Sequence, residues 1–238
     1  NLEHILDECI DAGIKEFIFI ISKKKESIKK YFFNDHFYKS ILAKKKDKRI
    51  KQYYQKLKKY QKMIKFVYQN KPKGTGDAIL KSQKLIKGSH FLMLFPDDLI
   101  IKKNCSKEMI LLHQKTKGSI IATKTVDKKT VSRWGILDLK KKKKNYFEIR
   151  DVVEKPPINK APSNYAIIGR YILPRTIMKK LQNLPFGHGQ EIHITDAIKE
   201  LVKSGEKFYG NIFKGKYLDC GTLDGYIKSA VEISKEKK

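Results

Sequence analysis

Helical and strand-like patterns alternate along the first part of the chain. Residues 2–10 carry apolar side chains at helical spacing, and Gly13 is suited to the position just after a helix. The run 17–21 (FIFII) is continuously apolar, as in a buried strand, and 23–33 again fits a helix. This order, helix then strand then helix, is typical of an α/β fold.

The same alternation continues to about residue 126. The Lys/Tyr/Gln-rich segment from about 34 to 62 is predicted to be a helical surface excursion. Because the run 91–95 (FLMLF) is apolar throughout, we expect a parallel strand covered on both faces. The other elements predicted here are strands at 63–69 and 119–126, a loop at 70–76, and helices at 77–86 and 106–116.

From Trp134 onward the pattern changes to short strands followed by closing helices. The fold predicted is α/β with a mixed, mostly parallel central sheet flanked by helices and a small antiparallel part. The chain, 1–238, shows no internal repeat and no flexible linker, so we expect a single domain. Strands are predicted at 134–139, 146–155 and 165–173, and helices at 175–182, 192–205 and 223–238.

Composition adds a strong basic bias. Lys and Arg total 53 and the formal net charge is +28, yet only five of these residues are arginine. Nucleic-acid surfaces usually use arginine as well, so a solvated lysine surface is favoured over nucleic-acid binding, which stays open as an alternative. No apolar run is long enough to span a membrane. The three scattered cysteines indicate neither disulfides nor a zinc site and suit the cytoplasm.

Two adjacent carboxylates, Asp97 and Asp98, follow the apolar run 91–95. Ligands of open α/β sheets bind at the carboxyl ends of strands, and Mg²⁺ prefers carboxylate and phosphate oxygens. A metal site is therefore one interpretation. Capping of a turn or helix by either aspartate is the other.

A glycine-containing loop lies between a predicted strand and a predicted helix at 70–76. Its glycines allow close approach of a ligand, and the helix N-terminus favours an anion. Gln69, at the strand end, has an amide that can read a base edge. The loop matches neither the Walker A motif nor the dinucleotide fingerprint, and an ordinary turn is the alternative.

Further charged residues stand at the ends of later elements. Glu154 and Lys155 leave a strand before two prolines, where a sugar and a phosphate are candidate ligands and a surface ion pair is the alternative. Glu191 stands just before a helix. Asp219 ends a strand before a glycine turn and is a second candidate metal ligand.

Read in order, these segments resemble the sugar nucleotidyltransferases, most closely the bacterial UTP–glucose-1-phosphate uridylyltransferases. The resemblance covers essentially the whole chain and rests on QNKPKGTGDAIL, LFPDDLI, RWGILD, VEKP, APSNYAIIGRYIL, GQEIHITDAI and YLDCGTLDGYIKS. It implies a Rossmann-like nucleotidyltransferase fold that transfers a uridylyl group from UTP to glucose 1-phosphate with Mg²⁺. It also implies two small-molecule substrates, neither nucleic-acid nor membrane partners, and a possible homo-oligomer.

The resemblance also implies a role for each matching residue. Lys155 and Asp97 become the expected catalytic residues, with Lys155 on the sugar phosphate. The remaining implied roles are uracil binding by Gln69 and the Gly74 backbone, magnesium binding by Asp97 and Asp219, and glucose binding by the Gly135 backbone, Glu154 and Glu191. Asp98 is expected to be structural.

The chain also departs from the family pattern. Asn70 and Asp77 stand where the family usually has Gly and often has His, and neither change removes an expected metal ligand. The G-x-G-T-R-type phosphate loop has no match, so the first strand and this loop are expected to be missing from the chain. Two alternatives therefore stay open: a nucleotidyltransferase of thymidylyl type, and a truncated, inactive relative.

Overall fold

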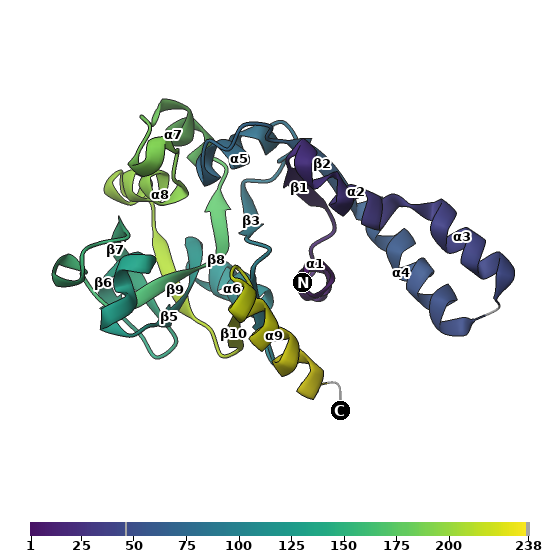
Figure 1. Cartoon of the computed structure of the whole chain (residues 1–238). Helices are drawn as coiled ribbons and strands as arrows, with labels where there is room; N and C mark the ends of the chain where they lie inside the picture. The colour runs from purple at the N-terminus through teal and green to yellow at the C-terminus, as the bar shows by residue number, and fades with distance from the viewer. Residues whose placement is uncertain (46, 237–238) are drawn as a thin grey trace.

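The computed structural model describes residues 1–45 and 47–236 (Figure 1). Its helices and strands follow the predicted order closely. The helices are α1 (Leu2–Asp11), α2 (Glu26–Phe33), α3 (Asp35–Lys44), α4 (Lys48–Met63), α5 (Thr75–Ser82), α6 (Cys105–Thr116), α7 (Ile177–Asn183), α8 (Ile194–Lys203) and α9 (Leu223–Glu236). The strands are β1 (Phe17–Ile21), β2 (Ile64–Tyr68), β3 (His90–Leu94), β4 (Asp98–Ile101), β5 (Ser119–Thr125), β6 (Gly135–Lys142), β7 (Tyr146–Glu154), β8 (Tyr165–Pro174), β9 (Phe208–Ile212) and β10 (Lys216–Asp219).

The main sheet has six strands in the order β3-β8-β5-β9-β7-β6, and β6 also pairs with β8. The mixed α/β fold is confirmed, but the expectation of mostly parallel neighbours is wrong for this sheet. Only β5 and β9 pair in parallel. The reason is that β8, from the second half of the chain, runs antiparallel between β3 and β5. Strands β3, β5 and β9 still point the same way, so their carboxyl ends share one edge.

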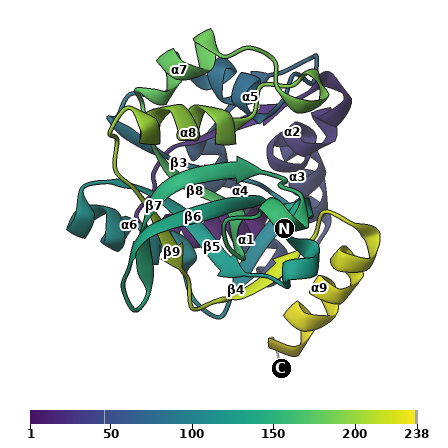
Figure 2. The same cartoon turned by 90° about the vertical axis from the view of Figure 1, so that its left-hand side faces the viewer.

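Helices cover both faces of this sheet (Figure 2). On one face, α5, α7 and α8 bury Ile79, Ile177 and Ile198 against the strands. On the other face, α6 buries Met109 and Leu112. The buried positions of helix α8 include Ile194, Ala197, Ile198 and Leu201. This spacing places them on one face of the helix. Burial of these apolar faces fixes the sheet edge on which the site is built.

The first part of the chain forms a second, smaller layer. Strands β1 and β2 pair in parallel and pack with α1, α2 and α4 around Leu6, Phe32 and Leu57. Helices α3 and α4 extend away from the rest of the molecule as an arm (Figure 1). Asn34 and Asp47 cap them by accepting hydrogen bonds from backbone N–H groups of the first helical turns.

A two-stranded antiparallel ribbon, β4 with β10, joins distant parts of the sequence. Asp98 stands opposite Asp219 in its register. Sequence patterning did not identify β9, which contributes the central parallel pair. In the described part of the chain, no helix is long and apolar enough to cross a membrane.

Candidate active site

Asp97 and Asp219 lie together, although 122 positions of sequence separate them. The backbone N–H of Cys220 donates to the carbonyl oxygen of Asp97 over 2.8 Å. Around Gly221 the two carboxylates converge: a Cβ atom placed on this glycine would lie 3.1 Å from Asp97 Oδ2 and 3.2 Å from Asp219 Oδ1. Glycine at this position lets one oxygen of each carboxylate come close to the same backbone, and Asp219 Oδ1 accepts a 2.9 Å hydrogen bond from the Gly221 N–H.

The oxygens around Gly221 suit a hard divalent cation. Among the described residues, no group of three or more His, Cys, Asp and Glu side chains is arranged to hold a metal. Mg²⁺ does not require such a cage, because it is commonly bound by one or two carboxylates together with water and substrate phosphates. The pair Asp97 and Asp219 fits that mode and could hold such an ion.

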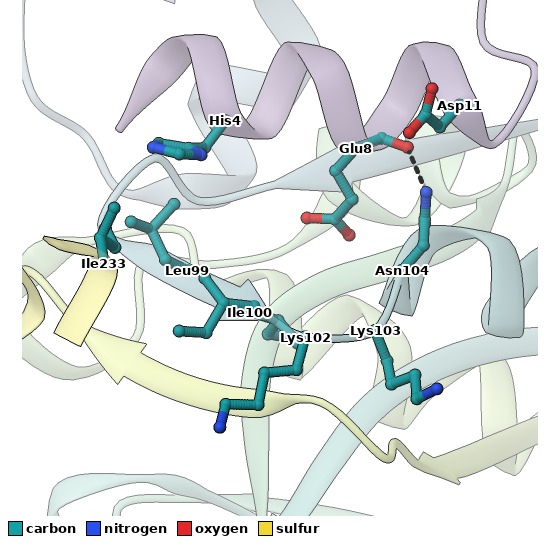
Figure 3. A pocket seen from close by; sticks show the side chains of 10 residues that line it. His4, Glu8, Asp11, Leu99, Ile100, Lys102, Lys103, Asn104 and Ile233 are labelled. Carbon is teal, nitrogen blue, oxygen red and sulfur yellow. Dashed lines mark hydrogen bonds between the residues drawn. The ribbon is translucent and has the colours of Figure 1, made fainter. Parts of the chain in front are cut away.

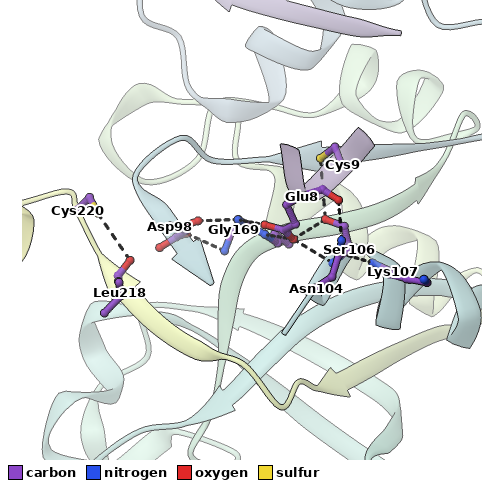
Figure 4. A network of polar contacts seen from close by, with 10 residues as sticks. Glu8, Cys9, Asp98, Asn104, Ser106, Lys107, Gly169, Leu218 and Cys220 are labelled. Carbon is purple, nitrogen blue, oxygen red and sulfur yellow. Dashed lines mark hydrogen bonds and ion pairs between the residues drawn. The ribbon is translucent and has the colours of Figure 1, made fainter. Parts of the chain in front are cut away.

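Asp98 faces a different way from Asp97. Its Oδ2 accepts a hydrogen bond of 2.8 Å from the Gly169 backbone N–H (Figure 4). Its Oδ1 accepts one from the Tyr217 hydroxyl. Burial raises the pKa of the Asp98 carboxyl, and the neighbouring charge of Asp97 acts in the same direction. With both carboxylate oxygens satisfied within the fold, Asp98 fixes the turn that carries Asp97.

A buried ion pair lies behind this turn. The guanidinium of Arg170 is fully buried and donates to Glu8 of α1 over 2.9 Å and to the carbonyl oxygen of Asp98 over 2.7 Å. Glu8 also accepts from the Ser106 hydroxyl over 2.6 Å (Figure 4). Burial acts to lower the pKa of Arg170, but the Glu8 carboxylate outweighs it and leaves the pKa raised. The ion pair therefore ties α1, α6 and β8 to the Asp97–Asp98 turn.

The glycine loop and the Glu191 segment form a second part of the site. Gly74 begins α5 with φ +94°, and a Cβ there would lie 2.6 Å from the Ile192 carbonyl oxygen and 2.9 Å from Glu191 Cβ. Both the left-handed backbone and the close approach require glycine at this position. The loop thus places Gly74 against Glu191 and Ile192.

The side chain of Gln69 reaches this loop. Its Nε2 donates to Asp77 Oδ2 over 2.8 Å and to the Gly74 carbonyl oxygen over 3.2 Å. Asp77 therefore does not cap α5, where Gly74 holds the N-cap position; it orients the Gln69 amide instead. Asp77, which stands where the family often has His, therefore has a structural role in this chain.

The third part of the site is the β6–β7 hairpin. Gly135 and Glu154 are direct partners in the ladder, and a Cβ on Gly135 would lie 3.2 Å from Glu154 Oε2 and 3.4 Å from Thr195 Cγ2. Thr195 stands in the first turn of α8, four residues after Glu191. Lys155 leaves β7 with φ +43°, an uncommon conformation for a non-glycine residue, and its N–H donates to the Trp134 carbonyl oxygen over 3.0 Å.

The structure therefore brings the predicted residues together in three local groups. Asp97 meets Asp219, Gln69 and Gly74 meet the Glu191 segment, and Gly135 meets Glu154 beside Lys155. The Glu191–Thr195 segment joins the second group to the third. The binding roles assigned to these residues stay predictions, while their positions are findings.

Several residues near the site were not identified from the sequence. Arg170 lies within YAIIGRYIL, and a lone arginine inside an apolar strand is the signal that indicates a buried partner. Tyr217 and Lys124 gave no usable signal, because tyrosines and lysines are abundant in this chain. The structure shows Lys124 Nζ 4.0 Å from the centre of the Tyr217 ring.

A surface hollow elsewhere contains none of the predicted site residues. It is lined by His4 and Glu8 of α1, by Leu99 of β4, by Asn104 and by Ile233 of α9, among others (Figure 3). Asn104 Nδ2 donates to the Glu8 carbonyl oxygen at its wall. The hollow lacks the paired carboxylates that face Gly221, so we do not assign it to the candidate active site.

Comparison with known proteins now decides the family. A family model described as "Nucleotidyl transferase" matches residues 29–236. The chain belongs to the nucleotidyl transferase family. This nucleotidyl transferase is 33% identical to the UTP–glucose-1-phosphate uridylyltransferase of Mycoplasma pneumoniae, over 96% of this chain and 79% of the relative. It is 31% identical to the enzyme of the same name from Bacillus subtilis, over 100% of this chain and 81% of the relative.

Solved structures agree with this assignment. A UDP-glucose pyrophosphorylase complexed with UDP-glucose matches this nucleotidyl transferase with a TM-score of 0.84 and 31% identity, over 99% of this chain and 86% of the other. A UTP-bound UGPase from Acinetobacter baumannii matches with a TM-score of 0.82 and 28% identity, over 98% and 82%. The resemblance inferred from the sequence motifs is therefore confirmed at the level of family and fold.

Proposed function

We propose that this nucleotidyl transferase forms UDP-glucose and pyrophosphate from UTP and glucose 1-phosphate. The observation that carries the proposal is the pair Asp97 and Asp219 beside Gly221. The family and the names of the relatives supply the substrates. A carboxylate pair in a protein of net charge +28 is what a metal-dependent reaction between two anions requires.

The reaction is a nucleotidyl transfer. A phosphate oxygen of glucose 1-phosphate attacks the α-phosphorus of UTP, forming one P–O bond while the bond to the bridging oxygen of the β-phosphate breaks. The electron pair of that bond leaves with pyrophosphate. Because the nucleophile is already an anion, no side chain is needed as a general base. The protein's task is to hold two repelling anions in line and to offset their charge.

Asp97 and Asp219 would hold Mg²⁺, which supplies positive charge to the reacting phosphates and a template for their orientation. The Cys220 to Asp97 hydrogen bond and the β4–β10 ladder keep the two carboxylates in register. Asp98 and Arg170 fix the backbone of the same turn. The carboxylates are thus set in place before substrate arrives, which keeps reorganisation small.

Gln69 is suited to bind the base. Both N–H groups of its amide are engaged, by Asp77 and by the Gly74 carbonyl, so the amide oxygen is oriented as the acceptor for the N3–H of uracil. Gly74 has a positive φ and packs closely against the Ile192 backbone, and its own backbone is proposed to contact the base. Thymine presents the same N3–H, so this contact selects a pyrimidine of this class and not UTP over dTTP.

Glu154, Glu191 and the Gly135 backbone are proposed to accept and donate hydrogen bonds to glucose hydroxyls, and Lys155 to hold the sugar phosphate. The Gly135–Glu154 ladder pair places the carboxylate beside the Gly135 backbone, so that both are suited to contact one sugar. The N–H of Lys155 is tied to Trp134, so the lysine leaves the same corner of the hairpin.

The test is a direct product assay. The purified protein is mixed with glucose 1-phosphate, Mg²⁺ and either UTP or dTTP, and the sugar nucleotide and pyrophosphate are quantified by chromatography. We expect UDP-glucose in stoichiometric amount with pyrophosphate, and faster turnover with UTP. Preferential use of dTTP would assign the chain to the thymidylyl type, and absence of product with any nucleotide would identify an inactive relative.

A further inference from the structure

Lys124 packs against two aromatic side chains, Tyr217 and Trp134, that neighbour the candidate site in the sequence. It stands one residue before the end of β5, a strand whose carboxyl end shares the sheet edge with that of β3. Its Nζ lies 4.0 Å from the centre of the Tyr217 ring and 5.8 Å from the centre of the Trp134 ring. Tyr217 is two residues before Asp219 in β10, and Trp134 directly precedes Gly135. The ammonium therefore lies beside two rings whose residues are close in sequence to Asp219 in β10 and to Gly135 in β6.

This lysine is half-buried and makes no ion pair within 4 Å in the part of the chain that the structure describes. Burial lowers the pKa of its amine, while the charges of Asp219 and Asp98 oppose that shift. Tyr217 and Trp134 restrict the side chain from two sides, and their ring faces favour a cation. A cation held in this way, with its N–H groups not used by a carboxylate, has donors available to an anionic ligand.

The position of Lys124 identifies that anion. In the proposed reaction, the phosphate of glucose 1-phosphate must link the sugar, held near Gly135, to the metal held by Asp97 and Asp219. Lys155 emerges from the same corner, since its N–H bonds to Trp134. Lys124, beside Tyr217 of the strand that carries Asp219, supplies a second cation near the metal end of the same phosphate.

We infer that Lys124 is a substrate-binding residue that acts with Lys155 to hold the phosphate of glucose 1-phosphate, and that holds the same phosphate in UDP-glucose. The inference rests on the proposed function and adds a binding residue to it. A lysine at this position contributes charge without fixed bidentate geometry, so it tolerates movement of the phosphate during transfer.

The experiment compares Lys124→Gln with Lys124→Arg and with Lys128→Gln. Lys128 is exposed, in the 3₁₀ segment Lys128–Arg133 that follows β5, and its replacement changes the net charge equally. For each protein, KM for glucose 1-phosphate and for UTP is measured, together with UDP-glucose binding by calorimetry in EDTA. The calorimetry reports phosphate binding without metal and without turnover.

For Lys124→Gln we expect KM for glucose 1-phosphate to rise by roughly ten- to one-hundred-fold, because a hydrogen bond to a charged group is lost. UDP-glucose binding in EDTA should weaken by a comparable factor. KM for UTP should change much less, Lys124→Arg should retain most of the affinity, and Lys128→Gln should match the wild type. Thermal melting confirms that each variant is folded.

Two results would overturn the inference while leaving the proposed function intact. One is an unchanged KM for glucose 1-phosphate in Lys124→Gln with wild-type turnover. The other is a change confined to the Mg²⁺ concentration needed for activity, which would mean that Lys124 only offsets the charge of the carboxylates. If the wild type itself forms no UDP-glucose, the proposed function fails, and this is seen before any variant is compared.

Discussion

The backbone N–H of Cys220 donates a 2.8 Å hydrogen bond to the carbonyl oxygen of Asp97. This single contact joins the turn after β3 to the end of β10, and it sets the carboxylates of Asp97 and Asp219 around Gly221. The relationship explains why two acidic residues are placed together in a strongly basic protein. Asp97 is in the turn between β3 and β4, Asp219 is the last residue of β10, and one oxygen of each carboxylate lies near Gly221.

Gly221→Ala tests whether these carboxylates hold the metal. The new Cβ would lie about 3 Å from both carboxylates, so it should crowd the ion without removing a ligand. We expect the Mg²⁺ concentration for half-maximal activity to rise by about tenfold, in the range seen when surroundings of metal ligands are altered. Mn²⁺ binding followed by electron paramagnetic resonance gives a second readout. Unchanged metal dependence, with the free energy of unfolding in EDTA also unchanged, would place the metal elsewhere.

Glu8→Gln tests the buried ion pair behind the Asp97–Asp98 turn. Removing the carboxylate charge leaves the fully buried guanidinium of Arg170 uncompensated, which should lower the free energy of unfolding by roughly 3–5 kcal/mol. Urea denaturation measures the change.

The matched control for that variant is Asp138→Asn. It removes one charge from the pair of Asp138 with Arg150, whose side chain is 64% exposed. Solvent screens this pair, so the loss should be below about 1 kcal/mol. Equal losses in the two variants would show that burial does not set the strength of the Glu8–Arg170 pair.

His90 predicts a pH dependence of stability that is separate from catalysis. Burial, and then the neighbouring His113 at 4.5 Å between ring centroids, lower the pKa of His90 below its usual 6.5. The folded state therefore binds a proton more weakly than the unfolded state, and stability is lost as the pH falls below 6.5. Urea denaturation at about pH 7.5 and 5.5 should show a larger loss for wild type than for His90→Gln. The exposed His36→Gln variant should follow the wild type, and an equal loss in His90→Gln would refute the role of His90.

The sequence predicted those parts of the fold that depend on local pattern. The helical spacing of residues 194–203 produced the expected helix. The apolar run before Asp97 produced a strand, but the expectation of a parallel strand covered on both faces is wrong, because β3 ends the sheet and pairs antiparallel with β8. The insertion of β8 between β3 and β5 was not predictable in the same way, because pairing between distant strands leaves no periodicity in either strand.

The same division applies to the candidate site. Motif order pointed to Asp97 and Asp219, but only the structure around Gly221 shows that their carboxylates come close together. The orientation of the Gln69 amide by Asp77 requires a contact across eight residues and a loop. Lys124 could not be separated from the many solvated lysines, because its distinguishing feature is its position beside Tyr217.

Asp97→Asn and Asp98→Asn test the central claim most directly, because the same chemical change is made at adjacent residues. UDP-glucose formation from UTP, glucose 1-phosphate and Mg²⁺ is measured for both variants and for wild type. The amide introduced by Asp98→Asn can still accept a hydrogen bond from Gly169 and donate one to Tyr217. We therefore predict that this variant stays folded. Its activity should be within a few-fold of wild type, a change of roughly the size that one altered hydrogen bond causes. Asp97→Asn should fold normally and lose at least about a hundredfold in rate, as expected when charge stabilisation of the transition state is removed. Near wild-type, Mg²⁺-dependent turnover by Asp97→Asn would contradict the account.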